Sequence, residues 1–177
     1  ILLHSRRSQR LPRRLWGLVE SQARCAEAVW REPDQGIWEA RGKPQHYVSS
    51  KLMCWVAFRR AAALAEIRAD ASLAEGWRAT AEEIKQDILT HGLTADGVLR
   101  QHYETDSLDA STLLAAMFGF LPPNDERLHA SVLAIADHLT EDGFVLRYRT
   151  DETDDGLSGK EGSFLICSFW LVSALSI

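Results

Sequence analysis

The hydrophobic positions of this chain follow two patterns, which predict helices of two kinds. In the first, an apolar stripe recurs at the helical period between charged residues, so that one face is buried and one is wet. This pattern covers residues 12–31, 73–89 and 125–140. In the second, apolar residues occupy every side, which is typical of a helix buried all round. That pattern covers residues 47–69, 108–120 and 162–176.

Capping and turn residues predict where these segments end. Ser72 and Glu75 have the spacing of a capping box, which predicts a helix that begins at Leu73. Asp96-Gly97 predicts a tight turn with a short hairpin. The prolines of residues 121–123 predict the end of the fourth helix, and residues 144–149 predict a short strand.

The two kinds of helix alternate along the chain, and this order predicts an all-α fold. An outer helix needs one apolar face that packs on its neighbours, whereas an inner helix surrounded by neighbours is apolar on all sides. We therefore expect one domain over residues 1–177, an α/α toroid in which outer helices wrap inner ones. A stacked helical-repeat solenoid is the alternative that the same burial pattern allows.

Charge and cysteine usage narrow the classes of function. A net charge of −5 argues against a general nucleic-acid binder, and no segment reaches the length of a membrane span. Cys54 and Cys167 lie in apolar runs, which predicts buried thiols of a reducing compartment or of a disulfide-free fold, and we expect a cytoplasmic protein. The Cys and His residues show no metal-ligand spacing, so we expect neither a metal nor a cofactor.

Three long loops precede the all-apolar helices: residues 33–46, 93–107 and 141–161. In a toroid these loops emerge on one face, where sites are usually built. They carry carboxylates and aromatic rings, which suit carbohydrate because rings stack on sugars and carboxylates bind hydroxyls or do acid–base work. The alternative interpretation of each acid is a solvated loop charge near a helix N-terminus.

Residues 34–42 are the most informative loop segment. Trp38 precedes Glu39, and Arg41 follows, between the glycines at 36 and 42. An indole that removes water from a glutamate raises its pKa, which is what a general acid near neutral pH requires. The alternative is a surface turn whose Trp38 fills the core and whose Glu39 and Arg41 form a weak ion pair.

The segments 34–42 and 46–57 resemble bacterial members of glycoside hydrolase family 15, which includes glucoamylases, glucodextranases and trehalases. Residues 155–172 are similar to the segment that carries a second catalytic carboxylate in that family. The resemblance begins near residue 15 and runs to the end of the sequence. It implies the C-terminal half of an (α/α)6-barrel catalytic domain and hydrolysis of α-glucosidic bonds with inversion.

The resemblance also implies roles for individual residues. Glu39 matches the general acid and Glu161 the general base, with their carboxyl groups about 6.5–9.5 Å apart to admit the attacking water. Trp38 is implied as a sugar platform and Arg41 as a donor to glucose hydroxyls. Lys51 either reaches the pocket as a further substrate contact or extends along apolar surface toward water.

Departures from the family pattern lead to further expectations. Ala40 stands where fungal members have a second acid. The predicted helices make half of the family's barrel, so we expect exposed apolar flanks that a second copy or a missing N-terminal half covers. The expected substrates are maltooligosaccharide, dextran or trehalose, with α-1,4, α-1,6 and α,α-1,1 linkages all open. A non-catalytic helical scaffold or carbohydrate-binding remnant is the alternative function.

Overall fold

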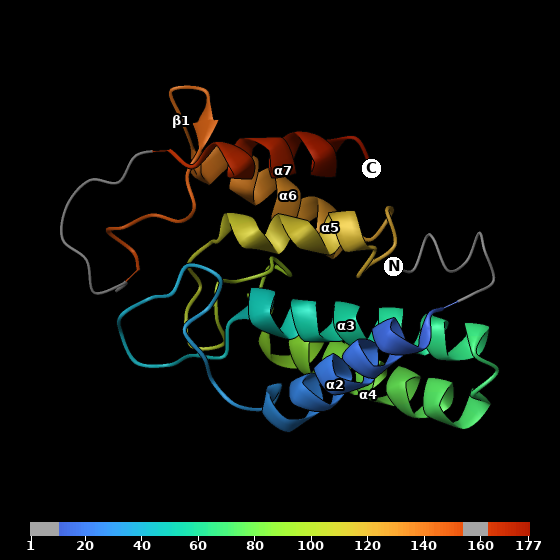
Figure 1. Cartoon of the computed structure of the whole chain (residues 1–177). Helices are drawn as coiled ribbons and strands as arrows, with labels where there is room; N and C mark the ends of the chain where they lie inside the picture. Colours follow the sequence, from blue (N-terminus) through green and yellow to red (C-terminus); the bar gives the residue numbers. More distant parts are fainter. Residues whose placement is uncertain (1–10, 154–162) are drawn as a thin grey trace. The chain divides into compact units, whose positions relative to one another are not determined.

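The computed structural model describes residues 11–153 and 163–177, which are mainly helical (Figure 1). The chain divides into two compact units. The first holds the described part of the segment that ends at Glu32, together with Lys51–Asp87. The second holds Pro33–Ser50 and the described part of Ile88–Ile177. The loop that carries Trp38 and Glu39 belongs to the second unit.

The first unit is built from helix α2 (Arg13–Val29) and from most of α3 (Val48–Ile67) and α4 (Ala71–His91). These helices lie side by side (Figure 1). The rings of Trp16 on α2 and Trp77 on α4 have centroids 5.7 Å apart, and the Arg68 guanidinium lies 4.8 Å from the Trp16 centroid. The three helices of this unit confirm that each of the three segments predicted to be helical in this region is a helix.

Two details of the first unit differ from the sequence prediction. Helix α4 begins at Ala71, and its cap is Asp70, whose Oδ1 accepts the backbone N–H of Leu73 at 3.1 Å. Ser72 lies inside the helix, so the capping box predicted there is wrong. Helix α3 is not buried all round, because Met53 is 43% exposed on one side while Phe58 is fully buried on another.

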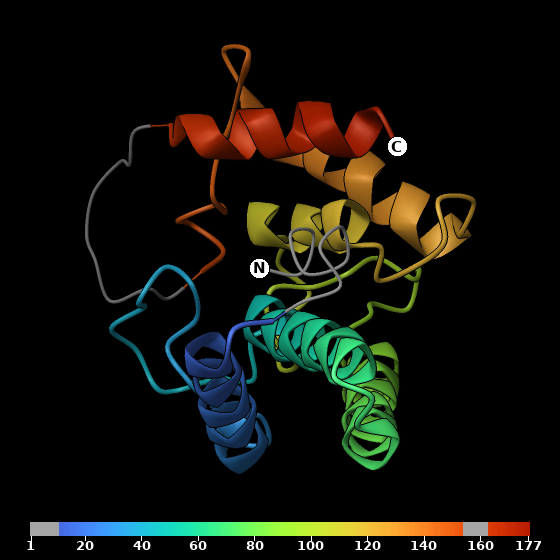
Figure 2. The ribbon, with the colours of Figure 1, turned by 45° about the vertical axis from the view of Figure 1, so that its right-hand side comes forward.

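The second unit contains the remaining regular elements. These are the 3-10 helix η1 (Ala110–Leu113), helices α5 (Leu114–Phe118), α6 (Glu126–His138) and α7 (Leu165–Leu175), and the paired strands β1 (Thr140–Glu141) and β2 (Phe144–Val145). Helices α5, α6 and α7 lie side by side (Figure 2). The stripe predicted for α6 is confirmed, since its core residues Leu128, Val132 and Ile135 are at most 7% exposed.

Local chemistry accounts for the differences in the second unit. The fourth predicted helix begins as η1, and it ends at Gly119 rather than at the prolines, because Gly119 adopts φ 67 and terminates α5. The turn at Gly97 is present, with φ 78, but the hairpin is reduced to one bridge between Leu93 and Leu99. The predicted strand is only the two residues of β2.

The α7 helix is apolar on every side but only one side is covered. Cys167 is fully buried, whereas Phe169 and Val172 are 69% and 65% exposed. The prediction that this helix is buried all round is therefore wrong for the described part of the chain. An exposed apolar flank of this kind is what the sequence predicts for an inner helix in half of a barrel.

Cys25, Cys54 and Cys167 form no disulfide with one another, and their surroundings differ. Cys25 is exposed, Cys54 is half-buried and Cys167 is buried. Burial raises the pKa of the Cys167 thiol to about 12, with a further increase from the nearby Asp109 carboxylate. Such a thiol is inert at neutral pH. Among the helices of residues 11–153 and 163–177, none has the length and hydropathy needed to cross a bilayer.

Candidate active site

The loop that carries Trp38 and Glu39 is closed at its base by Asp34. Asp34 and Gln45 exchange backbone hydrogen bonds of 2.9 and 2.8 Å. The Asp34 carboxylate accepts the backbone N–H of Gly36 at 2.5 Å and the Ser50 hydroxyl at 2.9 Å, which ties the loop to the first turn of α3. Because an Asp side chain that binds the N–H two residues on forms a turn, the sequence itself specifies this loop start.

The tip of the loop contains two left-handed residues, Gly36 at φ 69 and Glu39 at φ 54. A Cβ at Gly36 would lie 2.9 Å from Cγ of the Tyr47 ring, so glycine is required by both conformation and space. Glu39 is a non-glycine residue in this region, which costs about 1–3 kcal/mol. Backbone strain of this kind is concentrated at functional sites, and here it falls on the predicted general acid.

Trp38 is held by a buried carboxylate. Its indole Nε1–H donates to Asp109, at 3.0 Å from each carboxylate oxygen. Asp109 is 1% exposed and also accepts the Gln101 amide at 3.2 Å and the Ser111 backbone N–H at 2.7 Å. Burial raises the pKa of Asp109, against the opposing effect of hydrogen bonds from Ser111, Trp38 and Gln101.

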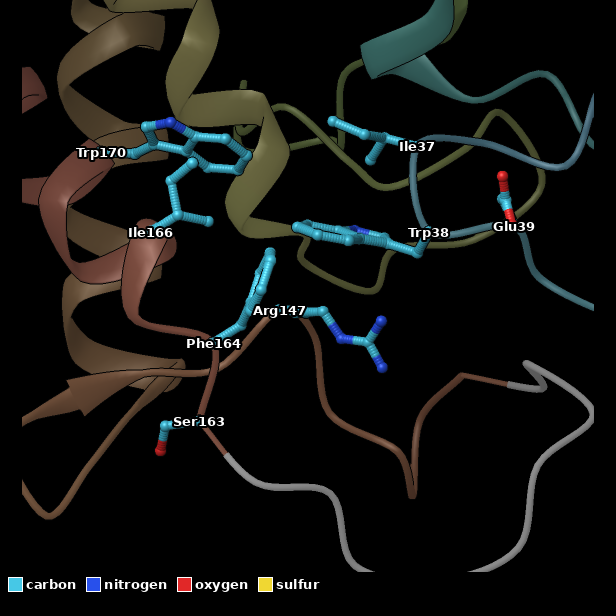
Figure 3. A pocket seen from close by; sticks show the side chains of 8 residues that line it. All are labelled: Ile37, Trp38, Glu39, Arg147, Ser163, Phe164, Ile166 and Trp170. Atoms are coloured by element: carbon cyan, nitrogen blue, oxygen red, sulfur yellow. The ribbon is translucent and has the colours of Figure 1, made fainter.

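The Trp38 ring forms the centre of an aromatic cluster, and the guanidinium of Arg147 lies over this ring. Phe164 meets it edge-on with centroids 5.7 Å apart, and Trp170 lies at 6.1 Å with tilted planes. The Arg147 guanidinium carbon lies 5.3 Å from the Trp38 ring centroid (Figure 3). These side chains come from the 33–46 loop, the segment after β2, and the N-cap and middle of α7.

A pocket of about 690 Å³ opens over this cluster. Its described lining residues are Ile37, Trp38, Glu39, Arg147, Ser163, Phe164, Ile166 and Trp170. The volume falls in the range of pockets that bind small molecules, and apolar walls with few polar groups are typical of such pockets. Trp38 separates the exposed Glu39 from the Phe164 and Trp170 side (Figure 3). The pocket therefore offers ring faces for stacking, a guanidinium donor and a carboxyl at one edge.

Comparison with known proteins bears on what this pocket does. The family model described as "Glycosyl hydrolases family 15" matches residues 3–176. The chain belongs to glycosyl hydrolases family 15. The resemblance noted in the loop sequences is thus confirmed over nearly the whole chain.

Three relatives with the name Trehalase support the same membership. Those of Mycolicibacterium smegmatis and Mycobacterium tuberculosis are 57% and 58% identical to it over 99% and 98% of this chain. That of Thermoplasma acidophilum is 39% identical over 91% of this chain. The matched regions are 26%, 25% and 28% of those proteins, so the chain spans about a quarter of the length of these relatives.

Solved structures establish the fold class. A glycosidase in complex with glucose superposes with a TM-score of 0.71 at 22% identity, over 84% of this chain and 38% of its own. A wild-type glycosidase gives a TM-score of 0.68 at 23% identity. The predicted fold, part of an (α/α)6 barrel with alternating outer and inner helices, is confirmed by this likeness.

The predicted site residues of this family 15 chain occupy different surroundings. Trp38 and Glu39 both line the pocket. Arg41 is exposed and is not among the described lining residues. Glu161 lies outside the described residues, so the separation of the two carboxyl groups stays a prediction. The roles assigned to these residues also stay predictions.

Lys51 is buried in the first unit, at 2% exposure. Its ammonium donates to the carbonyl of Trp30 and, at 3.4 Å, to that of Glu32. It also lies 5.7 Å from the Trp30 ring centroid. This position gives the lysine a structural role at the end of α2, because it binds the carbonyl of the C-cap residue Trp30 and that of Glu32 just beyond the helix. A sugar contact by Lys51 stays a prediction.

The sequence interpretation did not assign several residues that make this site. Phe164 and Trp170 were assigned to a buried helix, and their apolar run gave no sign that one side faces a pocket. The sequence pattern assigns no role to Asp109, which lies four residues before the apolar run 113–118, or to Arg147, which lies in the loop 141–161. Within the described residues no group of three or more His, Cys, Asp or Glu could hold a metal ion.

Proposed function

We propose that this chain carries part of the active site of an α-glucosidase and that the protein containing it hydrolyses trehalose. The observation that carries the proposal is Glu39, in a left-handed conformation at the edge of the aromatic pocket that Trp38 and Arg147 line. Family membership supports glycosidic hydrolysis, and the trehalase names of the relatives favour the α,α-1,1 linkage.

In the proposed mechanism Glu39 is the general acid. Its protonated carboxyl donates a proton to the departing glycosidic oxygen as the bond from that oxygen to the anomeric carbon breaks. A water then attacks the opposite face of the sugar, and Glu161 takes its proton as general base. The products are two glucose molecules. The one whose anomeric carbon is attacked is the β-anomer when it forms, because the reaction inverts the configuration at that carbon.

The pocket wall supports sugar binding beside this acid. The half-buried Trp38 ring lines the pocket and gives a flat apolar surface for a pyranose, and the Arg147 guanidinium over this ring carries N–H donors suited to hydroxyls. Arg41, on the exposed part of the same loop, is proposed as a further donor.

Assembly is the second part of the proposal. Leu165, Phe169 and Val172 of α7 are each more than half exposed, at 56%, 69% and 65%. An exposed apolar face of this size on an inner-type helix is a liability in solution. We propose that it is covered in the active protein by further helices of the barrel or by a second copy of this chain. Light scattering across a range of protein concentrations distinguishes the two.

The test uses the protein at the full length that its gene encodes. Glucose release is measured from trehalose, maltose and isomaltose, with the wild type and with Glu39→Gln. Glu27→Gln, an exposed carboxyl on α2, is the matched control. We expect trehalose to be the best substrate, and Glu39→Gln to lose about 10²–10⁴-fold in kcat. A folded wild type that binds glucose but turns over none of the three supports the carbohydrate-binding alternative instead.

A further inference from the structure

We propose that Asp109 is a positioning residue of this site, which orients Trp38 through its indole N–H and thereby sets the direction of Glu39. The inference rests on the proposed function. Asp109 and Trp38 are 71 positions apart in the sequence, and the bond between them is the direct polar link from the loop tip to η1 among those described. Nothing in the sequence pattern of either segment assigns Asp109 this role.

The geometry favours a carboxylate at this position over a neutral acceptor. The indole N–H lies 3.0 Å from both oxygens, and each oxygen takes a further donor: Ser111 N–H on one and the Gln101 amide on the other. An ionised Asp has acceptors only, so it satisfies all three donors at once. Charge-assisted hydrogen bonds are roughly twice as strong as neutral ones, which offsets part of the cost of burying this group.

The link from Trp38 to Glu39 is covalent and short. Glu39 follows Trp38 directly and has φ 54, so its side-chain direction depends on where the Trp38 backbone is held. The loop beneath is tied by the 2.9 Å bond from Ala40 N–H to the Gln35 carbonyl and by the Asp34–Gln45 pair. These contacts fix the loop base, and Asp109 adds an anchor at the tip. Without it the indole is free to turn within the aromatic cluster.

An ordinary structural role is the competing explanation, because Asp109 also caps η1 through Ser111. Capping alone predicts a loss of stability with normal chemistry at temperatures where the protein stays folded. Positioning predicts a loss of kcat that depends on Trp38. The two explanations therefore differ in a double-mutant comparison, since only the second makes the effects of the two residues non-additive.

The test compares Asp109→Asn, Trp38→Phe and their double variant in the full-length protein, well below the melting temperature of each. Asp125→Asn is the control, because Asp125 is likewise a helix cap, on α6, remote from the pocket residues in sequence. We expect Asp109→Asn to lower kcat about 10–100-fold on trehalose. Trp38→Phe keeps an aromatic ring but lacks the indole N–H. The kcat of the double variant should therefore be within twofold of that of Trp38→Phe alone.

A second readout does not need turnover. With 5-fluorotryptophan incorporated, the ¹⁹F resonance missing in Trp38→Phe belongs to Trp38, and we expect it to shift in Asp109→Asn but not in Asp125→Asn. Unchanged kcat with Asp109→Asn, or strictly additive losses, overturns the positioning role. An inactive wild type whose Trp38 resonance still shifts with Asp109→Asn overturns the proposed function, and with it the catalytic meaning of the bond.

Discussion

The Tyr47 ring packs directly against Gly36, so that a Cβ on Gly36 would lie 2.9 Å from ring atom Cγ and 3.0 Å from both Cδ atoms. Tyr47 is 5% exposed and cannot swing into solvent without opening the unit around it. The contact explains why the glycine of the loop cannot be exchanged, and it links the loop shape to the residue that precedes α3.

Gly36→Ala should therefore destabilise the chain more than an alanine at another left-handed glycine. Gly119→Ala is the matched control, because Gly119 has φ 67 but no atom within 4 Å of an added Cβ. We expect about 1–2 kcal/mol for the conformation alone at Gly119, and a further 1–3 kcal/mol from overpacking at Gly36. Urea unfolding measures both. Equal losses at the two sites would show that Tyr47 yields without cost.

Replacing Lys51 tests its structural role. Lys51→Met keeps the apolar stem of the side chain but removes the ammonium that donates hydrogen bonds to two backbone carbonyls. We expect a loss of about 1–3 kcal/mol in the free energy of unfolding. Lys43→Met, at an exposed lysine of the site loop, should change it by less than about 0.5 kcal/mol. If Lys51 binds sugar instead, Lys51→Met raises KM for trehalose while stability stays at the wild-type value.

The start of α4 offers a direct comparison of two candidate caps. Asp70 accepts the Leu73 N–H at 3.1 Å, whereas Ser72 is inside the helix. Asp70→Ala should cost about 1 kcal/mol, and Ser72→Ala should be neutral or slightly stabilising because alanine is the better helix former. Thermal and urea unfolding give both values. A larger cost at Ser72 than at Asp70 would return the cap to the position the sequence pattern suggested.

Buried Asp109 gives the stability a definite pH dependence. Burial raises the pKa of this carboxyl above its ordinary value of 3.8, so the folded chain keeps the proton to higher pH than the unfolded chain. Its contribution to stability is therefore complete below about pH 3.8 and declines as pH rises through the folded pKa. The difference in unfolding free energy between wild type and Asp109→Asn should decrease from pH 4 upward.

Asp125 provides the opposite sign as a control. Hydrogen bonds from Arg127 lower the pKa of Asp125 below 3.8, so its contribution is complete above about pH 3.8 and is lost as pH falls through the folded pKa. The wild type minus Asp125→Asn difference should be flat between pH 5 and 7. A wild type minus Asp109→Asn difference that does not decrease as pH rises from 4 would contradict the raised pKa.

Helix periodicity predicted most of the fold, because the spacing of apolar residues along a helix is a local property of the sequence. The stripe of Leu128, Val132 and Ile135 located α6 to within a residue or two, and the family resemblance named the loop that lines the pocket. Errors arose where two local signals compete. Ser72 with Glu75 matches a capping motif. Asp70, however, lies two residues earlier, and its carboxylate accepts the hydrogen bond from the Leu73 backbone N–H, so the helix begins before Ser72.

The missed parts of the site depend on contacts between distant segments. No local pattern relates Asp109 to Trp38, and an all-apolar run cannot reveal that Phe164 and Trp170 face a pocket. The same limit applies to exposure: Phe169 was expected to be buried from composition, but burial depends on which neighbours a helix has.

The proposed role of Glu39 as general acid is tested most directly by a comparison of substrates with different leaving groups. Trehalose needs protonation of the oxygen of its leaving group, whereas the fluoride ion of α-glucosyl fluoride leaves with little help from an acid. In the full-length protein we predict that Glu39→Gln lowers kcat/KM for trehalose about 10²–10⁴-fold while it keeps turnover of α-glucosyl fluoride within about tenfold of the wild type. Equal losses on both substrates, or no loss on trehalose, would contradict the account.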